Sequence, residues 1–273
     1  MNRIFVAYKP TGLSSNQFLS RLKRKYKVKK AGYSGTLDPF AKGCLIVAFG
    51  NFTRFFRFLD KAPKTYRATL WLGAASDTLD IEQVTNPKIV EPVKEEDILS
   101  IFEKLEGELE YEPPIFSAKK INGQRAYDLA RAGKEVVLNK IHSTIYEMKL
   151  LHYCHPFVTF EATVSEGTYI RSLGRIIAND LGLDGSLSAL ERLREGSFCY
   201  NNENTISPLD ALSMPRIKFK GNIEDIWLGK KINIEDMSHQ EDGVYLLHDE
   251  TLAAVLEIKD KKVSYLLNKV NLC

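Results

Sequence analysis

The order of strand-like and helix-like segments is the strongest constraint on what this chain can fold into. Tyr66, Ala68, Leu70 and Leu72 alternate with more polar positions, a period of two that predicts a strand buried on one side. Similar patterns over residues 144–152 and 158–164 predict two further strands. Helical patterns fall near residues 95–106, closed by Gly107, and over about 169–181, stopped at Gly182. Strands and helices do not alternate as regular βαβ units, so the expected class is α+β.

The first fifty residues carry four expected segments. Residues 4–8 read as a short strand that ends at a turn containing Pro10 and Gly12. Ser14 or Ser15 can cap a following helix, whose apolar stripe is Phe18, Leu19 and Leu22. A glycine-punctuated loop over residues 32–39 precedes the apolar run 44–48, which predicts a buried strand.

A second unit is expected at the C-terminus. Pro208, Pro215 and Gly221 mark a boundary, after which short apolar segments fall at 243–247, 252–258 and 263–267 between charged turns. We therefore expect a domain over residues 1–212 and a small β domain over residues 213–273.

Charge is distributed very unevenly along the chain. Residues 1–59 contain 12 Lys and Arg but a single acid, Asp38, which gives +11, and the remainder carries 3 − 11 = −8. Seven of the ten residues from 21 to 30 are basic. A solvated basic helix would explain one such cluster, but it explains poorly the lack of acids over nearly sixty residues. The asymmetry favours contact with a polyanion.

Cysteines and apolar runs indicate the compartment. The four cysteines, at 44, 154, 199 and 273, form no Cys-x-x-Cys pair, which is typical of a reducing cytosol. His152, Cys154 and His155 are the one local Cys/His cluster, and no second ligand pair follows at zinc spacing, so no metal site is expected. No apolar run reaches membrane-spanning length and no signal-peptide core is present at the N-terminus. We expect a soluble, cytoplasmic protein.

Asp38 is the leading candidate for catalysis. It lies in the most basic region of the chain, between glycines and before a proline, and nearby cations would keep its pKa low and the carboxylate ionised. An ordinary Asp-Pro turn is an equally good explanation from composition alone. Tyr66 follows Lys64 and precedes Arg67, so its ring could stack on a base while cations hold phosphates. Singly, Tyr66 could also be a half-exposed strand residue.

Arg171 and Arg175 lie four residues apart at the start of the helix expected over 169–181, and hence on one face. Either could pair with a carboxylate or a phosphate. Arg171 could equally be an ordinary charge on a helix surface.

Six motifs in order resemble the TruB family of pseudouridine synthases. The catalytic motif of that family resembles residues 35–43, GTLDPFAKG. The others are similar to KPTGLSS at 9–15, KTYRA at 64–68, SDTLD at 76–80, PPIFSA at 113–118 with RAY at 125–127, and SEGTYIRSL at 165–173. They occur in the family's order over roughly residues 3–195, which is most of the chain.

The resemblance implies a fold, an activity and a set of site residues. The fold would be a mixed, largely antiparallel sheet with flanking helices, followed by a reduced PUA-like RNA-binding domain. The activity would be isomerisation of uridine 55, in the T arm of tRNA, to pseudouridine. Asp38 would be the essential carboxylate, Tyr66 would stack on the flipped base, and Arg171 would hold Asp38 by a salt bridge. Further substrate contacts are expected from Lys9, Tyr33, Lys64, Arg67, Asp77, Tyr169 and Leu190.

The resemblance also implies partners and absences. The basic residues Lys23, Arg24, Lys27 and Lys29 would contact the RNA backbone. No metal or cofactor is expected, because isomerisation needs no redox partner or activated water. A monomer without an obligatory protein partner is also expected. Two positions depart from the family: Tyr33 stands where a histidine is usual, and Glu166 where a lysine is common.

Two other functions stay open. A non-catalytic RNA-binding or RNA-folding protein could use the same scaffold, although Asp38, Tyr66 and Arg171 together disfavour it. A hydrolase could cleave a glycosidic bond with paired carboxylates if Asp77 or Asp80 approached Asp38 in space. Nothing in the sequence decides whether Asp38 would attack the ribose, attack the base or act as a base.

Overall fold

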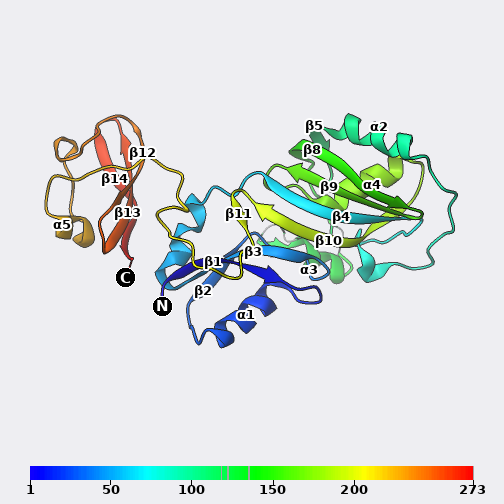
Figure 1. The fold of residues 1–273 in the computed structure, drawn as a ribbon, viewed down its shortest axis with the longest axis horizontal. Helices are drawn as coiled ribbons and strands as arrows, with labels where there is room; N and C mark the ends of the chain where they lie inside the picture. Colours follow the sequence, from blue (N-terminus) through cyan, green and yellow to red (C-terminus); the bar gives the residue numbers. More distant parts are fainter. Residues whose placement is uncertain (118, 122, 135, 273) are drawn as a thin grey trace.

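A large mixed sheet forms most of the protein (Figure 1). The computed structural model describes residues 1–117, 119–121, 123–134 and 136–272. The sheet has nine strands in the order β1-β3-β10-β4-β9-β8-β5, with β2 paired to β3 and β11 paired to β10. Its strands are β1 (Arg3–Lys9), β2 (Ala31–Ser34), β3 (Lys42–Phe49), β4 (Lys64–Leu72), β5 (Gly107–Tyr111), β8 (Ile141–Cys154), β9 (Phe157–Val164), β10 (Gly185–Glu195) and β11 (Phe198–Cys199).

Helices flank this sheet, and a short hairpin, β6 (Lys120–Ile121) with β7 (Gln124–Arg125), stands apart from it. Helix α1 lies beside β2, α2 beside β8, and α4 beside β10 and β4. The helices are α1 (Ser15–Lys25), α2 (Glu95–Leu105), α3 (Ala126–Arg131), α4 (Ile170–Asp180) and α5 (Ile223–Leu228), with 3-10 turns η1 (Gly50–Phe58), η2 (Ile81–Gln83) and η3 (Ile234–Asp236). Within the described residues, no helix combines the length and apolar character needed to cross a membrane.

The expected class, α+β with a largely antiparallel sheet, is confirmed. Strands β1, β3, β4, β8 and β9 and helices α1, α2 and α4 form where the sequence predicts them. Ser14 caps α1 by accepting a hydrogen bond from the backbone N–H of Gln17, and the Gln17 side chain accepts one from Ser14 in return. Strand β4 alternates between buried and more exposed residues over its whole length.

Strand β10 was not predicted, although it lies at the centre of the sheet. It pairs parallel with β3 and antiparallel with β4, and thereby joins the N-terminal strands to the rest of the sheet. Gly43 faces Arg192 across the parallel pair with φ at 114°, and a Cβ there would lie 2.2 Å from the Arg192 carbonyl oxygen. Only glycine allows the two strands to approach this closely.

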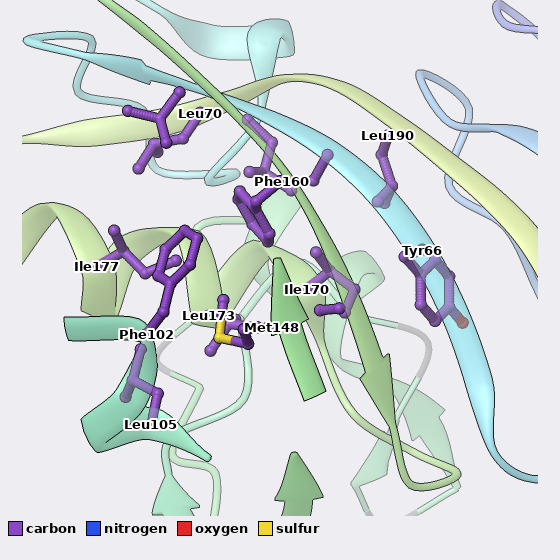
Figure 2. Packing of buried hydrophobic residues seen from close by; sticks show 14 of the residues in the cluster. Tyr66, Leu70, Phe102, Leu105, Met148, Phe160, Ile170, Leu173, Ile177 and Leu190 are labelled. Atoms are coloured by element: carbon purple, nitrogen blue, oxygen red, sulfur yellow. The ribbon is translucent and has the colours of Figure 1, made fainter. Parts of the chain in front are cut away.

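The main core lies between the sheet and helices α2 and α4 (Figure 2). Leu70, Phe160 and Ile177 are fully buried there, together with Phe102 and Leu173. Tyr66 and Leu190 belong to the same cluster and lie at one end of it, apart from the helices in Figure 2. The end of the core is therefore where these two side chains meet the surface that carries Asp38.

A second, three-stranded sheet follows near the C-terminus, at one end of the molecule (Figure 1). It consists of β12 (Gly243–His248), β13 (Leu252–Lys259) and β14 (Lys262–Asn271), all antiparallel and at the predicted positions. Its buried residues Leu246, Val255 and Leu267 share a hydrophobic cluster with Ile46 of β3 and Phe55 of η1. One continuous core thus crosses from the first sheet to the second.

Candidate active site

Asp38 lies in a loop that neighbouring segments hold in place at its backbone. Ser15, in the first turn of α1, donates its hydroxyl to the Leu37 carbonyl at 3.0 Å and accepts the Leu37 N–H at 2.9 Å. The Gly12 N–H donates to the Pro39 carbonyl at 2.8 Å. Because backbone groups on both sides of Asp38 are fixed, its carboxylate projects from a rigid loop. The sequence suggests Ser15 as a helix cap and as part of the motif at 9–15, but gives no sign of this contact with Leu37.

Lys9 holds the same loop through hydrogen bonds to its backbone carbonyls. Its side chain is fully buried, and its Nζ donates to the carbonyls of Pro10 (2.9 Å), Leu13 (2.7 Å) and Pro39 (3.5 Å). Burial lowers the pKa of Lys9 to about 8, although the Asp38 charge raises it. The expected direct substrate contact does not fit this position, because a buried ammonium already bound to three carbonyls cannot reach a ligand.

Arg171, in the first turn of α4, holds the Asp38 carboxylate. Its Nε lies 2.9 Å from Asp38 Oδ2, so the salt bridge that the resemblance implies is present. Its Nη1 lies 2.7 Å from the Thr78 carbonyl and 3.4 Å from Asp80 Oδ2, and its Nη2 donates to the Phe116 carbonyl at 2.9 Å. The side chain is only 4% exposed, so Arg171 is not a helix-surface charge.

Asp80, which the sequence suggests only as a possible second carboxylate of a hydrolase, lies at the site in place of Asp77. Its carboxylate is buried, accepts the Thr78 hydroxyl at 2.6 Å and the Glu82 N–H at 2.9 Å, and faces Arg171. The expected contact residue Asp77 is instead exposed, and it does not line the hollows at Asp38. The two residues belong to one acidic turn, and only the backbone course through Thr78 decides which of them points inward.

The electrostatics at Asp38 differ from the expectation. Burial raises the pKa of the Asp38 carboxyl above its ordinary value, Arg171 lowers it, and the neighbouring Asp80 carboxylate raises it. The expected lowered pKa is therefore wrong in direction. The seven basic residues of 21–30, which suggested it, lie on α1 or just after it, and none of them lines the hollows at Asp38.

A hollow of about 270 Å³ opens beside Asp38. It brings together Lys64, Tyr66, Tyr169, Arg171 and Leu190 from three separate segments of the chain. A second hollow of about 250 Å³ also reaches Asp38 and Arg171, and Tyr33 lines it together with Tyr127 and Arg131. The Tyr33 hydroxyl lies 3.1 Å from Asn16 Oδ1.

Arg67 lies outside both hollows. Side chains alternate between the two faces of a strand, so Lys64 and Tyr66 share one face of β4 while Arg67 points to the other. There its guanidinium binds Glu161 on the paired strand β9, with Nη2 to Oε1 at 2.6 Å. The expectation that Arg67 contacts the same substrate groups as Tyr66 does not agree with this arrangement.

The basic segment lies on and just after α1. Arg24, Lys27 and Lys29 are exposed and Lys23 is half-buried, and none of the four forms an ion pair within the residues the structure describes. Lys25, by contrast, pairs with Glu203. These four cations are thus available to an external anion.

No group of three or more His, Cys, Asp or Glu side chains among the described residues is placed to hold a metal ion. His155, from the cluster noted in the sequence, is engaged otherwise: its Nε2 lies 2.8 Å from the Val90 carbonyl oxygen.

Comparison with known proteins identifies the family. The family model described as TruB family pseudouridylate synthase (N terminal domain) matches residues 23–170. The chain belongs to the TruB family of pseudouridylate synthases. Two relatives named "tRNA pseudouridine synthase B" support this: one from Sulfurimonas denitrificans is 59% identical over 99% of both chains, and one from Campylobacter curvus is 52% identical over 100% of both chains.

Solved structures share the fold of this TruB-family protein at lower sequence identity. A chain from the crystal structure of a Cbf5-Nop10-Gar1 complex superposes with a TM-score of 0.72 and 20% identity, covering 99% of this chain and 85% of that one. A chain from an archaeal box H/ACA sRNP Nop10-Cbf5 complex gives 0.69 at 19% identity, covering 98% and 86%. These structures confirm the fold, and the family model and the full-length relatives confirm the family predicted from six short motifs.

Proposed function

We propose that this TruB-family protein isomerises uridine 55, in the T arm of tRNA, to pseudouridine. The observation that carries the proposal is the Asp38 carboxylate, held at 2.9 Å by the buried Arg171 in the same hollow as Tyr66 and Leu190. The names of full-length relatives support tRNA as the substrate.

The reaction would require the target nucleotide to leave its stack. Flipping a base out costs about a few kcal/mol, and stacking on the Tyr66 ring offsets part of that cost. The N1–C1′ bond then breaks, C5 of the base bonds to C1′, the C5 proton leaves and a proton is taken up at N1, so that no proton is gained or lost overall. Asp38 would act on the ribose or the base, Arg171 would keep it oriented, and the Tyr66 hydroxyl would accept the C5 proton. Leu190 would pack against the flipped nucleotide, and Lys64, Tyr33 and Tyr169 would contact its neighbours.

Two surfaces would bind the rest of the RNA. Lys23, Arg24, Lys27 and Lys29 carry the charge for phosphate contacts. Residues 213–273 would act as a reduced PUA-like domain, and the three strands β12–β14 support that proposal. Arg67 and Asp77 would meet RNA only outside the nucleotide pocket, and Lys9 would position the Asp38 loop.

We propose that the enzyme works as a monomer in the cytoplasm, without a metal, a cofactor or an obligatory protein partner. Isomerisation moves one bond and one proton and transfers no net electrons, so its chemistry needs no oxidant or reductant.

The test is to incubate the purified protein with unmodified tRNA and to map pseudouridine by chemical derivatisation. We expect modification at position 55 and its loss in Asp38→Asn, with folding and RNA affinity retained. Asp184→Asn is the matched control, because Asp184 is an exposed carboxylate paired with Lys88. Turnover by Asp38→Asn close to that of the control would exclude Asp38 as the catalytic carboxylate.

The same experiment separates the alternatives. A hydrolase would release free uracil, and an RNA-binding protein without activity would leave the uridine unchanged. Asp80 does lie near Asp38, as the hydrolase hypothesis requires, but its carboxylate is buried and committed to Thr78, Glu82 and Arg171. A carboxylate with these partners is poorly placed to activate water, so the isomerase is favoured.

A further inference from the structure

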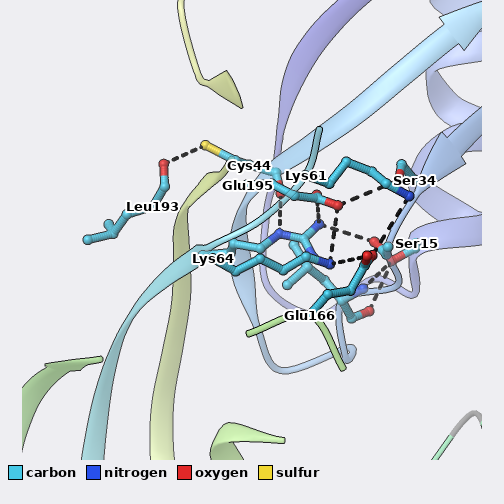
Figure 3. A network of polar contacts seen from close by, with 11 residues as sticks. Ser15, Ser34, Cys44, Lys61, Lys64, Glu166, Leu193 and Glu195 are labelled. Atoms are coloured by element: carbon cyan, nitrogen blue, oxygen red, sulfur yellow. Dashed lines mark hydrogen bonds and ion pairs between the residues drawn. The ribbon is translucent and has the colours of Figure 1, made fainter. Parts of the chain in front are cut away.

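A buried charge network lies beside the candidate pocket (Figure 3). At its centre is Glu195, the last residue of β10, whose side chain is fully buried. Arg192 Nη2 lies 3.2 Å from Glu195 Oε2, and Lys64 Nζ lies 3.3 Å from Glu195 Oε1. The buried part of the network therefore contains two cations and a single anion.

A third cation and an exposed anion complete the network at the surface. Lys61, just before β4, has a side chain only 19% exposed, and Lys64 only 8%. Glu166, in the turn between β9 and α4, has a side chain 55% exposed, and its Oε1 lies 3.7 Å from Lys61 Nζ and 3.4 Å from Lys64 Nζ. A single oxygen of the Glu166 carboxylate thus forms ion pairs with both ammonium groups, as Figure 3 shows.

The Glu166 contacts have the character of a replaceable ion pair. Strong N–H···O⁻ contacts are about 2.7–2.9 Å long, and both distances here are well beyond that. Partly exposed ion pairs contribute little stability because solvent screens them. Glu195 is different, since it is buried and cannot leave without stranding Arg192 and Lys64. Any anion that reaches this position from solvent will therefore displace Glu166 rather than Glu195.

The position of the network determines which anion arrives. Lys64, Glu166 and Arg192 line the same hollow as Asp38 and Tyr66. A nucleotide whose base enters that hollow brings its backbone phosphates to the rim. A phosphodiester carries one negative charge, as a carboxylate does, so exchanging one for the other preserves the charge of the site.

We propose that Lys61 and Lys64 form a binding site for a backbone phosphate of the RNA, and that Glu166 occupies this site in the free protein. The proposal rests on the proposed RNA substrate. Glu166 is then an internal competitor of the RNA. When the phosphate binds, the displaced carboxylate takes up a cation from solvent, so RNA binding releases one counterion fewer than the phosphate contacts alone would release.

The test compares Glu166→Gln with Glu147→Gln, both in an Asp38→Asn background that prevents turnover. Glu147 is the matched control, because it is an exposed carboxylate on β8 paired with Lys149 at 2.7 Å. The dissociation constant of unmodified tRNA is measured at several salt concentrations. We expect Glu166→Gln to bind about 2- to 5-fold more tightly at low salt, and its log Kd to depend more steeply on log salt by about 0.7–0.9. A dissociation constant and slope equal to those of Glu147→Gln would overturn the proposal.

A double mutant separates a shared site from a general charge effect. Lys61 has Glu166 as its only ion-pair partner within the described residues. In a Lys61→Met background the gain from Glu166→Gln should shrink, because one of the two uncovered cations is gone. An undiminished gain would mean that Glu166 acts only as a distant negative charge, and the proposal would fail. Pseudouridine mapping with the unmutated protein is separate: a protein that forms none, yet shows the Glu166 effect, would refute the proposed function and leave the phosphate site standing.

Discussion

At the scale of single residues, Arg171 determines what Asp38 can do. The guanidinium is 4% exposed and touches two carboxylates and two carbonyls, so its position is over-determined. Breaking a buried pair of this kind costs about 3–5 kcal/mol, because a buried charge is left without a partner. Asp38, with a side chain 35% exposed, is the member of the group that a substrate can reach.

The pH dependence of activity should reveal the influence of Asp80 on Asp38. Burial and the Asp80 charge both raise the pKa of Asp38, so an activity that needs the carboxylate ionised should fall in acid at a higher pH than an ordinary aspartate would give. Asp80→Asn removes the second negative charge, so Asp38 becomes the only carboxylate of the two that is paired with Arg171. The pKa of Asp38 should then decrease, and the acid limb of kcat/KM should move to lower pH. An acid limb that stays in place would show that Asp80 does not influence Asp38, and one that moves upward would show that the Asp80 charge does not raise the pKa of Asp38.

Tyr66 allows the ring and the hydroxyl to be tested separately. Tyr66→Phe keeps the ring, which provides stacking worth about 1–3 kcal/mol per base, and removes only the proton acceptor. We expect normal RNA binding but single-turnover rates at least about 10²-fold lower, as is typical when a general base is lost. Tyr66→Ala is less informative, because Tyr66 is 8% exposed in the main core and its loss would leave a cavity. A Phe variant within about threefold of wild type would restrict Tyr66 to stacking.

At the scale of elements, periodicity predicted most of the long strands but not β10. The shorter strands β2, β5, β6, β7 and β11 were not predicted either, and β2 lies partly within the expected loop over residues 32–39. Irregularities in the pairing of β10 with β4 fall between Leu187 and Ala189 and between Arg192 and Arg194. As a result the buried residues from Leu187 onward are Leu187, Leu190, Arg192 and Glu195, a spacing closer to that of a helix than to strict alternation. A sequence pattern cannot show where a bulge will fall, since the partner strand fixes it.

The candidate site was predictable to a similar degree. Short motifs identified Asp38, Tyr66 and Arg171, and the structure brings all three to one hollow. The pleat of β4 explains why Arg67 lies elsewhere, and could have been used in advance. The inward turn of Asp80 and the buried Glu195 could not have been foreseen, because both depend on contacts between segments distant in the sequence.

The contribution of the basic segment at α1 to RNA affinity should depend on how many phosphates it contacts. Replacing Lys23, Arg24, Lys27 and Lys29 by Gln should weaken RNA binding and reduce the salt slope of log Kd by as much as about 3–4, at roughly 0.9 per phosphate contact. A control replaces four exposed lysines elsewhere, Lys88, Lys104, Lys140 and Lys149, with the same change in net charge. Equal slopes for the two variants would mean that the segment is only a solvated face.

At the scale of the whole molecule, the two sheets depend on one another. Leu246, Val255 and Leu267 pack with Ile46 and Phe55 across the expected boundary at residues 212 and 213. Polar contacts add to this, with Arg54 Nη1 donating to the Asn268 carbonyl at 2.6 Å and Asn2 Nδ2 to the Asn271 carbonyl at 3.0 Å. The C-terminal strands therefore stabilise the region from which the Asp38 loop projects.

Removing residues 214–273 should consequently lower stability as well as RNA affinity. Each large apolar side chain uncovered costs about 1.5–3 kcal/mol, and several are uncovered at once, against a total stability of about 5–15 kcal/mol. We expect a large decrease in Tm or aggregation, measured by thermal unfolding. Leu267→Ala, expected to cost about 2–5 kcal/mol, tests the same packing in the full chain. A truncated protein with the same Tm as the intact protein would show that the shared cluster is not needed for stability.

The position of β10 in the sheet determines how late in translation the large sheet can be completed. One edge of β3 pairs with β1, and residues 46–49 of its other edge pair with β2. The start of that second edge, at Lys42 and Gly43, pairs with β10, which is synthesised only after residue 184. At about 5–20 residues per second the interval is on the order of ten seconds. Throughout it, Lys42 and Gly43 of β3 and one edge of β4 lack their partner strand. Open strand edges are the kind of surface on which nascent proteins associate wrongly. Arg171 precedes β10 in the chain, so both members of the Asp38–Arg171 pair are synthesised before the strand that joins the two halves of the sheet.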